Sequence, residues 1–214
     1  MARNKYPEET RRRILQVSRR LFLEKGYEHT TVQDIVDALG DLTKGAVYHH
    51  FASKEDIFSA LGDELFSEDN PFEQARRGPG TGLEKMRRVI ELSGQNAQRT
   101  ELTRQALPLL ENPRVLAQTI ESDEQVLAPL WRSLLEEGNR DGSLHTEYAD
   151  ELAEVLPLLT NVWMALHMDE GGEAVMRRVR FLAHMLESMG VPLFDERLMA
   201  SMEQYVQTLT RSEQ

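Results

Sequence analysis

Residues 42–58 read LTKGAVYHHFASKEDIF and combine residue types that can bind phosphate, a metal ion or DNA. A shared metal is disfavoured, because the adjacent His49 and His50 would point about a third of a turn apart on a helix, unlike a ligand pair spaced i, i+4. A P-loop is disfavoured too, because the stretch lacks the glycine-rich loop, lysine and following Ser/Thr of that motif. The remaining interpretation is a helix that binds DNA and contacts its bases.

Four side chains of this stretch suit contacts with the DNA backbone. Thr43 offers a hydroxyl at a helix N-terminus, where the helix dipole favours negative charge. Lys44 can reach a phosphate or a guanine edge. Tyr48 and His49 can donate to phosphates, and such contacts position a protein without reading the base sequence.

Small residues in the same stretch would let the helix approach the bases. Gly45 and Ala46 have almost no side chain, and Ala46 could touch a thymine methyl group. Val47 and Phe51 are four residues apart and are expected to face inward as core. His50 is interpreted as a core or interface histidine rather than a DNA contact.

The elements around this stretch form a recognisable supersecondary unit. Helical periodicity predicts helices over residues 8–25, 32–39, 43–50 and 53–70. Thr31, Thr43 and Ser53 are the expected N-caps, and Gly26 is expected to end the first helix. Two short helices joined by a tight turn, with a longer helix across them, make a helix-turn-helix, whose second helix enters the major groove.

The rest of the chain also has helical periodicity, without a convincing strand. A joint is expected at the Pro- and Gly-rich residues 70–82. Further helices are expected near residues 82–109, 113–119, 121–139, 147–168, 173–190 and 194–211, with kinks or early ends at Pro108 and Pro157. The predicted fold class is all-α: a helix-turn-helix domain over residues 1–56 with a linking helix over 53–70, then a helical-bundle domain over 71–214.

Charge and composition narrow the partners. The net charge is −11, yet residues 1–25 carry eight Lys/Arg against three Glu, while the residues after 56 carry fifteen basic and twenty-seven acidic side chains. A basic N-terminal segment on an otherwise acidic chain could bind a polyanion at that end. A basic helix that is merely exposed to solvent would give the same distribution of charge. The chain has no cysteine, which excludes disulfides and cysteine-based zinc sites. Without a membrane-spanning run or a signal peptide, a cytoplasmic protein that does not contact membranes is expected.

Residues from about 9 to 66 resemble the DNA-binding domain of the tetracycline-repressor (TetR) family of bacterial transcriptional regulators. The resemblance rests on ILQVSRRLFLEKGYEHTTVQDIVDALG followed by TKGAVYHHFASKEDIF. One departure is visible: the turn Gly40-Asp41-Leu42-Thr43 is one residue longer than the usual Gly-Val-Ser or Gly-Val-Thr. The extra residue could rotate the recognition helix, which affects base contacts more than phosphate contacts.

The resemblance implies a set of DNA contacts and a mode of action. The implied DNA-binding residues are Thr31, Gln33, Thr43, Lys44, Gly45, Ala46, Tyr48, His49 and Lys54. It further implies a homodimer that binds a double-stranded, palindromic operator and, as a repressor, is released by a small-molecule effector that the sequence does not identify.

In relatives the larger domain binds the effector and dimerises through its last long helices. Apolar residues at helical spacing make a candidate dimer interface of Leu152, Val155, Leu159, Val179, Leu182 and Leu186, although the same pattern fits the domain's own core. Large or adaptable side chains suggest an effector pocket of Trp131, Trp163, Met164 and His167, with plain core again as the alternative.

Other classes of function find less support. The sequence shows no nucleophile–base arrangement, paired-carboxylate motif or nucleotide fingerprint, so neither an enzyme nor a cofactor is expected, and no metal site is predicted. Two alternatives stay open. One is a regulator without a small-molecule effector, controlled by a protein partner on the acidic body. The other is a helical enzyme or ligand carrier with an incidental helix-turn-helix.

Overall fold

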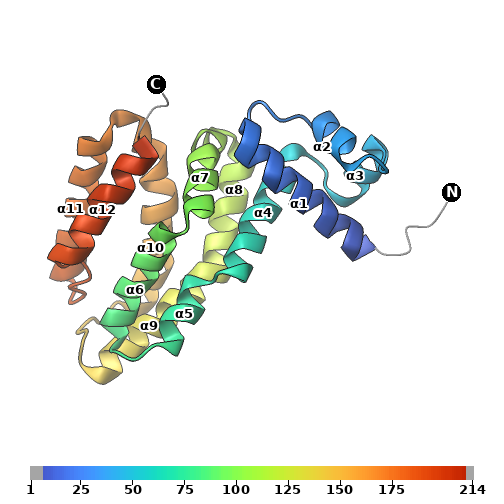
Figure 1. Cartoon of the computed structure of the whole chain (residues 1–214). Helices are drawn as coiled ribbons and strands as arrows, with labels where there is room; N and C mark the ends of the chain where they lie inside the picture. The colour runs from blue at the N-terminus through green and yellow to red at the C-terminus, as the bar shows by residue number, and fades with distance from the viewer. Residues whose placement is uncertain (1–6, 211–214) are drawn as a thin grey trace. The chain divides into compact units, whose positions relative to one another are not determined.

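The computed structural model describes residues 7–210 and is all-α over that range (Figure 1). Residues 1–6 and 211–214, which include the basic Arg3 and Lys5 and the last residue of the helix expected at 194–211, lie outside the described residues. The chain divides between Asp69 and Asn70 into two compact units. Of the helices in residues 7–210, none combines the length and the apolar character needed to cross a membrane.

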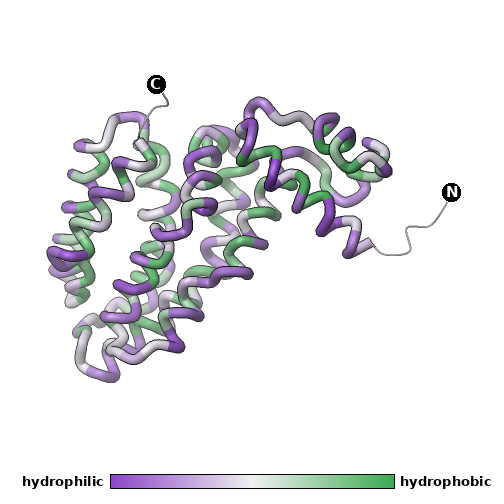
Figure 2. Tube along the Cα trace, viewed as in Figure 1, coloured by the Kyte–Doolittle hydropathy of each residue, from purple (hydrophilic) through white to green (hydrophobic). Residues whose placement is uncertain are grey.

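Over residues 7–69 the first unit contains four helices: α1 (Pro7–Lys25), α2 (Val32–Leu39), α3 (Lys44–His50) and α4 (Lys54–Glu68). Helix α1 contacts both α2 and α4, and α2 contacts α3. Their shared core is fully or almost fully buried and consists of Ile14, Leu15, Phe22, Ile35, Val47, Ile57 and Leu61. Figure 2 shows apolar and polar residues alternating along these helices, as expected for amphipathic helices around one core.

The second unit contains α5 (Pro71–Arg77), α6 (Gly82–Gln95), α7 (Ala97–Ala106), α8 (Pro113–Ser122), α9 (Ala128–Asp141), α10 (Ala149–Pro157), α11 (Gly172–Ser188) and α12 (Glu196–Thr210). Helix α9 packs against α6 and α10, α5 packs against α6, and α11 packs against α12. Shorter helical segments join them: the 3-10 turns η1 (Leu107–Glu111) and η4 (Ala165–Glu170) and the π-helical segments η2 (Asp123–Leu127) and η3 (Leu158–Trp163).

The second unit differs from the sequence expectation in several places. The expected joint at 70–82 contains a helix, α5, because Asn70 caps it and Pro71 occupies its first turn, where proline is tolerated. The helix expected over 82–109 is interrupted at Asn96, which caps α7. Pro108 lies in the 3-10 turn η1 and Pro157 ends α10, so both prolines interrupt regular helix as predicted.

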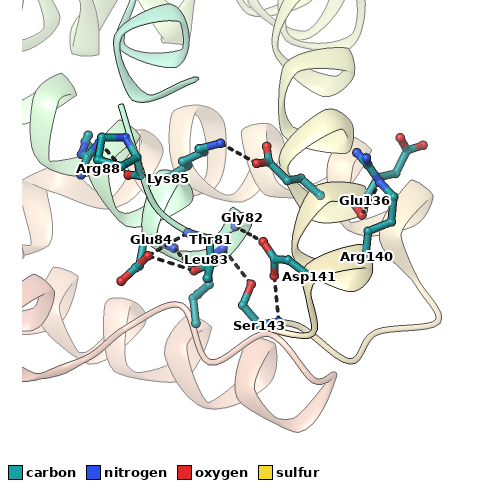
Figure 3. Close-up of polar contacts among 12 residues, drawn as sticks. Thr81, Gly82, Leu83, Glu84, Lys85, Arg88, Glu136, Arg140, Asp141 and Ser143 are labelled. Carbon is teal, nitrogen blue, oxygen red and sulfur yellow. Dashed lines mark hydrogen bonds and ion pairs between the residues drawn. The ribbon is translucent and has the colours of Figure 1, made fainter. Parts of the chain in front are cut away.

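The start of α6 is fixed against the end of α9 (Figure 3). The N–H of Gly82 donates to Oδ2 of Asp141 at 2.7 Å, and the N–H of Leu83 donates to Oγ of Ser143 at 3.2 Å. A Cβ atom on Gly82 would lie 2.2 Å from the backbone nitrogen of Gly138, so the two helices cross with no room for a side chain. These bonds satisfy N–H groups that a helix start leaves open.

Candidate DNA-binding interface

Capping interactions set the geometry of the α2–turn–α3 unit. Thr31 and Asp34 form a capping box at the start of α2, in which the N–H of Thr31 donates to Oδ2 of Asp34 at 2.8 Å. The hydrogen bonds from the Thr31 side chain and backbone, and then the Lys25 ammonium, lower the pKa of Asp34 to about 2. Gly40 ends α2 in the left-handed conformation, at φ 75°, which glycine adopts without strain.

Helix α3 has one buried side and one exposed side. Val47 is 0% exposed and Phe51 is 5% exposed, so the prediction that both face inward is confirmed. The exposed side carries Thr43, Lys44, Gly45, Tyr48 and His49, and Ala46 is half-buried. The structure therefore gathers six of the nine predicted DNA-binding residues on one short helix and its cap.

Two of these side chains retain the donors that a phosphate needs. Oγ1 of Thr43 accepts the N–H of Ala46 at 3.2 Å, which leaves the hydroxyl hydrogen free to donate elsewhere. Nζ of Lys44 lies 6.0 Å from the centroid of the Tyr48 ring, so the ammonium and the phenol occupy the same side of α3.

An ion pair that the sequence did not predict holds the turn between α2 and α3. Arg13 of α1 donates from Nη1 and Nη2 to the two carboxylate oxygens of Asp41, at 2.9 and 2.7 Å. Asp41 lies in the turn between α2 and α3, and the pair ties this turn to α1. The available signal was an acidic residue in the turn of a unit whose first helix is rich in arginine.

The remaining predicted contacts lie outside α3. Thr31 and Gln33 are exposed on α2, but the Thr31 hydroxyl donates to Asp34 and the Gln33 amide donates to Oδ1 of Asp37 at 2.7 Å. A DNA phosphate would have to compete with these bonds. The DNA contacts of Thr31 and Gln33 stay predictions.

Lys54 is bound within its own unit. Its ammonium donates to the carbonyl oxygen of Tyr27 at 2.8 Å and lies 3.9 Å from the centroid of the Tyr27 ring. Tyr27 is buried, and its hydroxyl donates to Oε1 of Glu55 at 3.0 Å. Burial and this hydrogen bond raise the pKa of Tyr27. Tyr27 thus fixes the start of α4, and the implied DNA contact of Lys54 stays a prediction.

The two adjacent histidines behave differently from each other. His49 is exposed and His50 is half-buried, with ring centroids 5.5 Å apart. Burial, and then the neighbouring His49, lower the pKa of His50, which disfavours its charged form. Over residues 7–210, no group of three or more His, Asp or Glu side chains is arranged to hold a metal ion.

The four predicted pocket residues fall into two settings. Trp163 and His167 lie together, with ring centroids 6.2 Å apart and Nδ1 of His167 2.7 Å from the Trp163 carbonyl oxygen. Trp131 instead packs edge-on against Phe72, with centroids 4.9 Å apart, and Met164 is 7% exposed. The pocket stays a prediction.

The predicted dimer interface is mostly core of the chain itself. Leu152, Val179, Leu182 and Leu186 are at most 5% exposed, and Leu159 is half-buried. Val155 is 40% exposed and could meet a partner. Other large apolar side chains are exposed on the same part of the chain: Leu158, Leu166, Phe181 and Met189.

A shallow groove lies beside the fixed start of α6. It has a volume of about 440 Å³ and is lined by Gly80, Thr81, Glu84, Glu137, Arg140 and Asp141. Glu84 and Asp141 already accept hydrogen bonds from the α6 N-terminus, and Glu137 pairs with Lys85. The groove contains none of the predicted pocket residues, and its carboxylates serve the packing of α6 on α9.

Comparison with known proteins gives the family. Residues 14–61 match the family model described as "Bacterial regulatory proteins, tetR family". Over 175 residues the chain is 30% identical to the HTH-type transcriptional repressor KstR2 of Rhodococcus jostii, an alignment that covers 77% of this chain and 82% of the relative.

Solved structures share the fold. A TetR-family transcriptional regulator from Pectobacterium atrosepticum is similar with a TM-score of 0.63 at 22% identity, over 88% of this chain and 98% of that one. A transcriptional regulator from Saccharomonospora viridis, in complex with choline, is similar with a TM-score of 0.55 at 22% identity, over 84% and 96% of the two chains. Because residues 14–61 match the family model and KstR2 is 30% identical over 82% of its own length, the chain belongs to the TetR family of bacterial regulatory proteins.

Proposed function

We propose that this protein is a cytoplasmic transcriptional repressor that binds a palindromic DNA operator as a homodimer and is released by a small-molecule effector. The observation that carries the proposal is the exposed side of α3, where an ammonium, two hydroxyls and an imidazole surround the side-chain-free Gly45. KstR2 of Rhodococcus jostii, one of the relatives, is a transcriptional repressor, which supports a regulatory rather than an enzymatic role.

In this proposal α3 lies in the major groove. The Thr43 hydroxyl and the Tyr48 phenol donate to phosphates and set the register of the helix. Lys44 contacts a phosphate or a guanine edge, and Gly45 and Ala46 face the bases. The Arg13–Asp41 pair acts indirectly, because it holds the turn that leads into α3.

A second copy of the chain is the proposed partner of the exposed apolar side chains on the later helices. Val155 and Leu158 of the α10–η3 region, Leu166 of η4 and Phe181 of α11 are between 36% and 57% exposed. Exposed apolar groups gathered on a few helices are typical of an interaction surface. Two copies would place two α3 helices against the two halves of a palindrome.

Release from the operator requires that the effector bind more tightly to a conformation of the second unit in which the protein binds DNA poorly. The choline complex of the Saccharomonospora viridis protein is one case in which a chain of this fold holds a small molecule. A coupling free energy of about 1–3 kcal/mol would change operator affinity roughly 5- to 150-fold. We place the effector in residues 70–214.

The test begins with selection of binding sites from random double-stranded DNA, followed by affinity measurements at several salt concentrations. A palindrome, with affinity that falls steeply as salt rises, is the expected result. Lys44→Ala should weaken binding and lower the salt dependence by about one ion per subunit. Tyr48→Phe should weaken binding without a change in melting temperature.

Arg180→Ala is the matched control, because Arg180 is an exposed cation of α11 in the second unit. It removes the same charge as Lys44→Ala and should leave operator affinity nearly unchanged. If Lys44→Ala and Arg180→Ala weaken binding equally, the net charge of the chain matters and α3 does not read DNA. Binding without sequence preference would also contradict the proposal.

A further inference from the structure

Asp123 is an acidic side chain in the interior of the second unit. It is 5% exposed, and its Oδ1 accepts one hydrogen bond, from Nδ2 of Asn161 at 2.9 Å. The other carboxylate oxygen, Oδ2, is buried without a hydrogen-bond partner. Buried polar atoms are nearly always paired in folded proteins, so an orphaned carboxylate oxygen needs an explanation.

No cation of the described residues balances this carboxylate. Burial is the main cause that raises the pKa of Asp123, to about 6, and the hydrogen bond from Asn161 opposes it only in part. A Lys, Arg or His nearby would lower the pKa through its charge, and none among residues 7–210 does so. The site therefore holds an acidic group that lacks a positive partner, which is costly in an interior.

Both members of the pair lie on irregular helical turns. Asp123 begins the π-helical segment η2, and Asn161 lies within the π-helical segment η3. Segment η2 packs against α10, and η3 packs against α8. π-helical turns are rare and occur frequently at functional sites. Two of them meeting at one buried carboxylate argue for a binding role rather than for packing alone.

The carboxylate is close to the surface and to apolar side chains. Asn161 itself is exposed, so the residue that bonds Asp123 also reaches solvent. Ile120, three residues before Asp123, is 38% exposed, and Val126, three residues after it, is 43% exposed. Leu158, three residues before Asn161, is 36% exposed. A ligand with an apolar body would cover these groups while its polar end reached Asp123.

We propose that Asp123 and Asn161 form the polar anchor of a site for a small organic cation, in which an ammonium group carried on an apolar body donates to Oδ2 of Asp123. Asn161 holds the carboxylate in place through Oδ1. The binding claim stands on the geometry of this pair, and only the description of the cation as the effector rests on the proposed function.

The test measures binding of matched charged and neutral probes to the full chain by calorimetry. The charged probes are 2-phenylethylamine, n-hexylamine and n-octylamine at neutral pH, and the neutral probes are the corresponding alcohols. The amines should bind more tightly than the alcohols. Asp123→Asn should weaken amine binding about tenfold or more, as expected for loss of a hydrogen bond to a charged group, and should leave alcohol binding unchanged.

Glu124→Gln is the matched control, because Glu124 is the exposed acidic neighbour of Asp123. It removes one negative charge at nearly the same place and should leave amine binding intact. The proposal is overturned if no amine of the series binds the wild-type chain at millimolar concentration. It is also overturned if Asp123→Asn and Glu124→Gln affect amine binding alike.

Operator binding separates this proposal from the proposed function. Without a probe, Asp123→Asn should bind the selected operator as the wild-type chain does. Loss of amine binding in Asp123→Asn, in a chain that recovers no operator, would support the cation site and contradict the repressor. Operator binding by a wild-type chain that binds no amine would support the repressor and contradict the cation site.

Discussion

The orphaned carboxylate of Asp123 should make stability depend on pH in a way that one substitution removes. Its pKa rises from an ordinary 3.8 to about 6 in the folded chain. At 1.36 kcal/mol for each pKa unit, this rise corresponds to about 3 kcal/mol. The folded state holds the proton more tightly than the unfolded state, so the unfolding free energy should fall as the pH rises from about 4 to about 7.

Asp123→Asn keeps an oxygen that can accept the Asn161 hydrogen bond but cannot ionise. The difference in unfolding free energy, variant minus wild type, should therefore grow by about 2.4 kcal/mol between about pH 4 and about pH 7, because the unfolded chain has already lost half of this proton near pH 4. Other carboxylates titrate equally in both proteins and cancel. The buried amide N–H of the variant adds a cost that does not change with pH.

Urea denaturation followed by tryptophan fluorescence is the appropriate assay. Both tryptophans of the chain, Trp131 and Trp163, lie in the second unit, so the signal reports on the part that contains Asp123. Glu124→Gln should give a difference that stays flat with pH. A flat difference for Asp123→Asn as well would show that Asp123 ionises normally, and the reasoning about its burial would be refuted.

Three further predictions concern other contacts. Gly82→Ala should lower the melting temperature of the second unit, at a cost of about 1–3 kcal/mol for overpacking against Gly138. Gly62→Ala, in an open part of α4, should instead stabilise the first unit by about 0.5–1 kcal/mol. Equal effects of the two substitutions in thermal melts would contradict the close crossing. Thr31→Ala should cost the first unit about 1 kcal/mol in chemical denaturation through loss of the α2 cap, and a neutral result would argue against the capping box. Lys54→Met should destabilise the first unit by about 1–2 kcal/mol, because it removes the hydrogen bond to the Tyr27 carbonyl and the contact of the ammonium with the Tyr27 ring. Lys44→Ala should leave the stability unchanged. A lower denaturation midpoint for Lys44→Ala than for Lys54→Met would refute these assignments.

Local signals in the sequence were sufficient for the helix-turn-helix. Thr31, Thr43 and Ser53 cap the helices they were expected to cap, because an N-cap bonds only to residues two or three positions along the chain. The boundaries of α2 agree with the prediction at both ends. Residues 70–82 were expected to be a joint, yet they contain α5. The reason is related: Asn70 and Pro71 are typical of turns, and they are equally typical of the start of a helix.

The features that could not be predicted from the sequence depend on contacts between distant segments of the chain. Periodicity identified the apolar side of α11, but it could not tell whether Val179 and Leu182 meet their own chain or a partner, and both are core. Asp123 has no distinguishing neighbours in the sequence, and its burial arises only when η2 packs against α10. The π-helical segments were equally invisible, because a single extra residue in a helical turn hardly alters an apolar pattern.

The close crossing of Gly82 and Gly138 has a consequence for how the second unit can move. Helix α9 is held at its Asp141 end, where its backbone at Gly138 meets the backbone of Gly82 and Asp141 accepts the N–H of Gly82. Its other end, at Ala128, follows directly on the π-helical segment that begins with Asp123. A rearrangement caused by a ligand at Asp123 would therefore involve the Ala128 end of α9 rather than its Asp141 end.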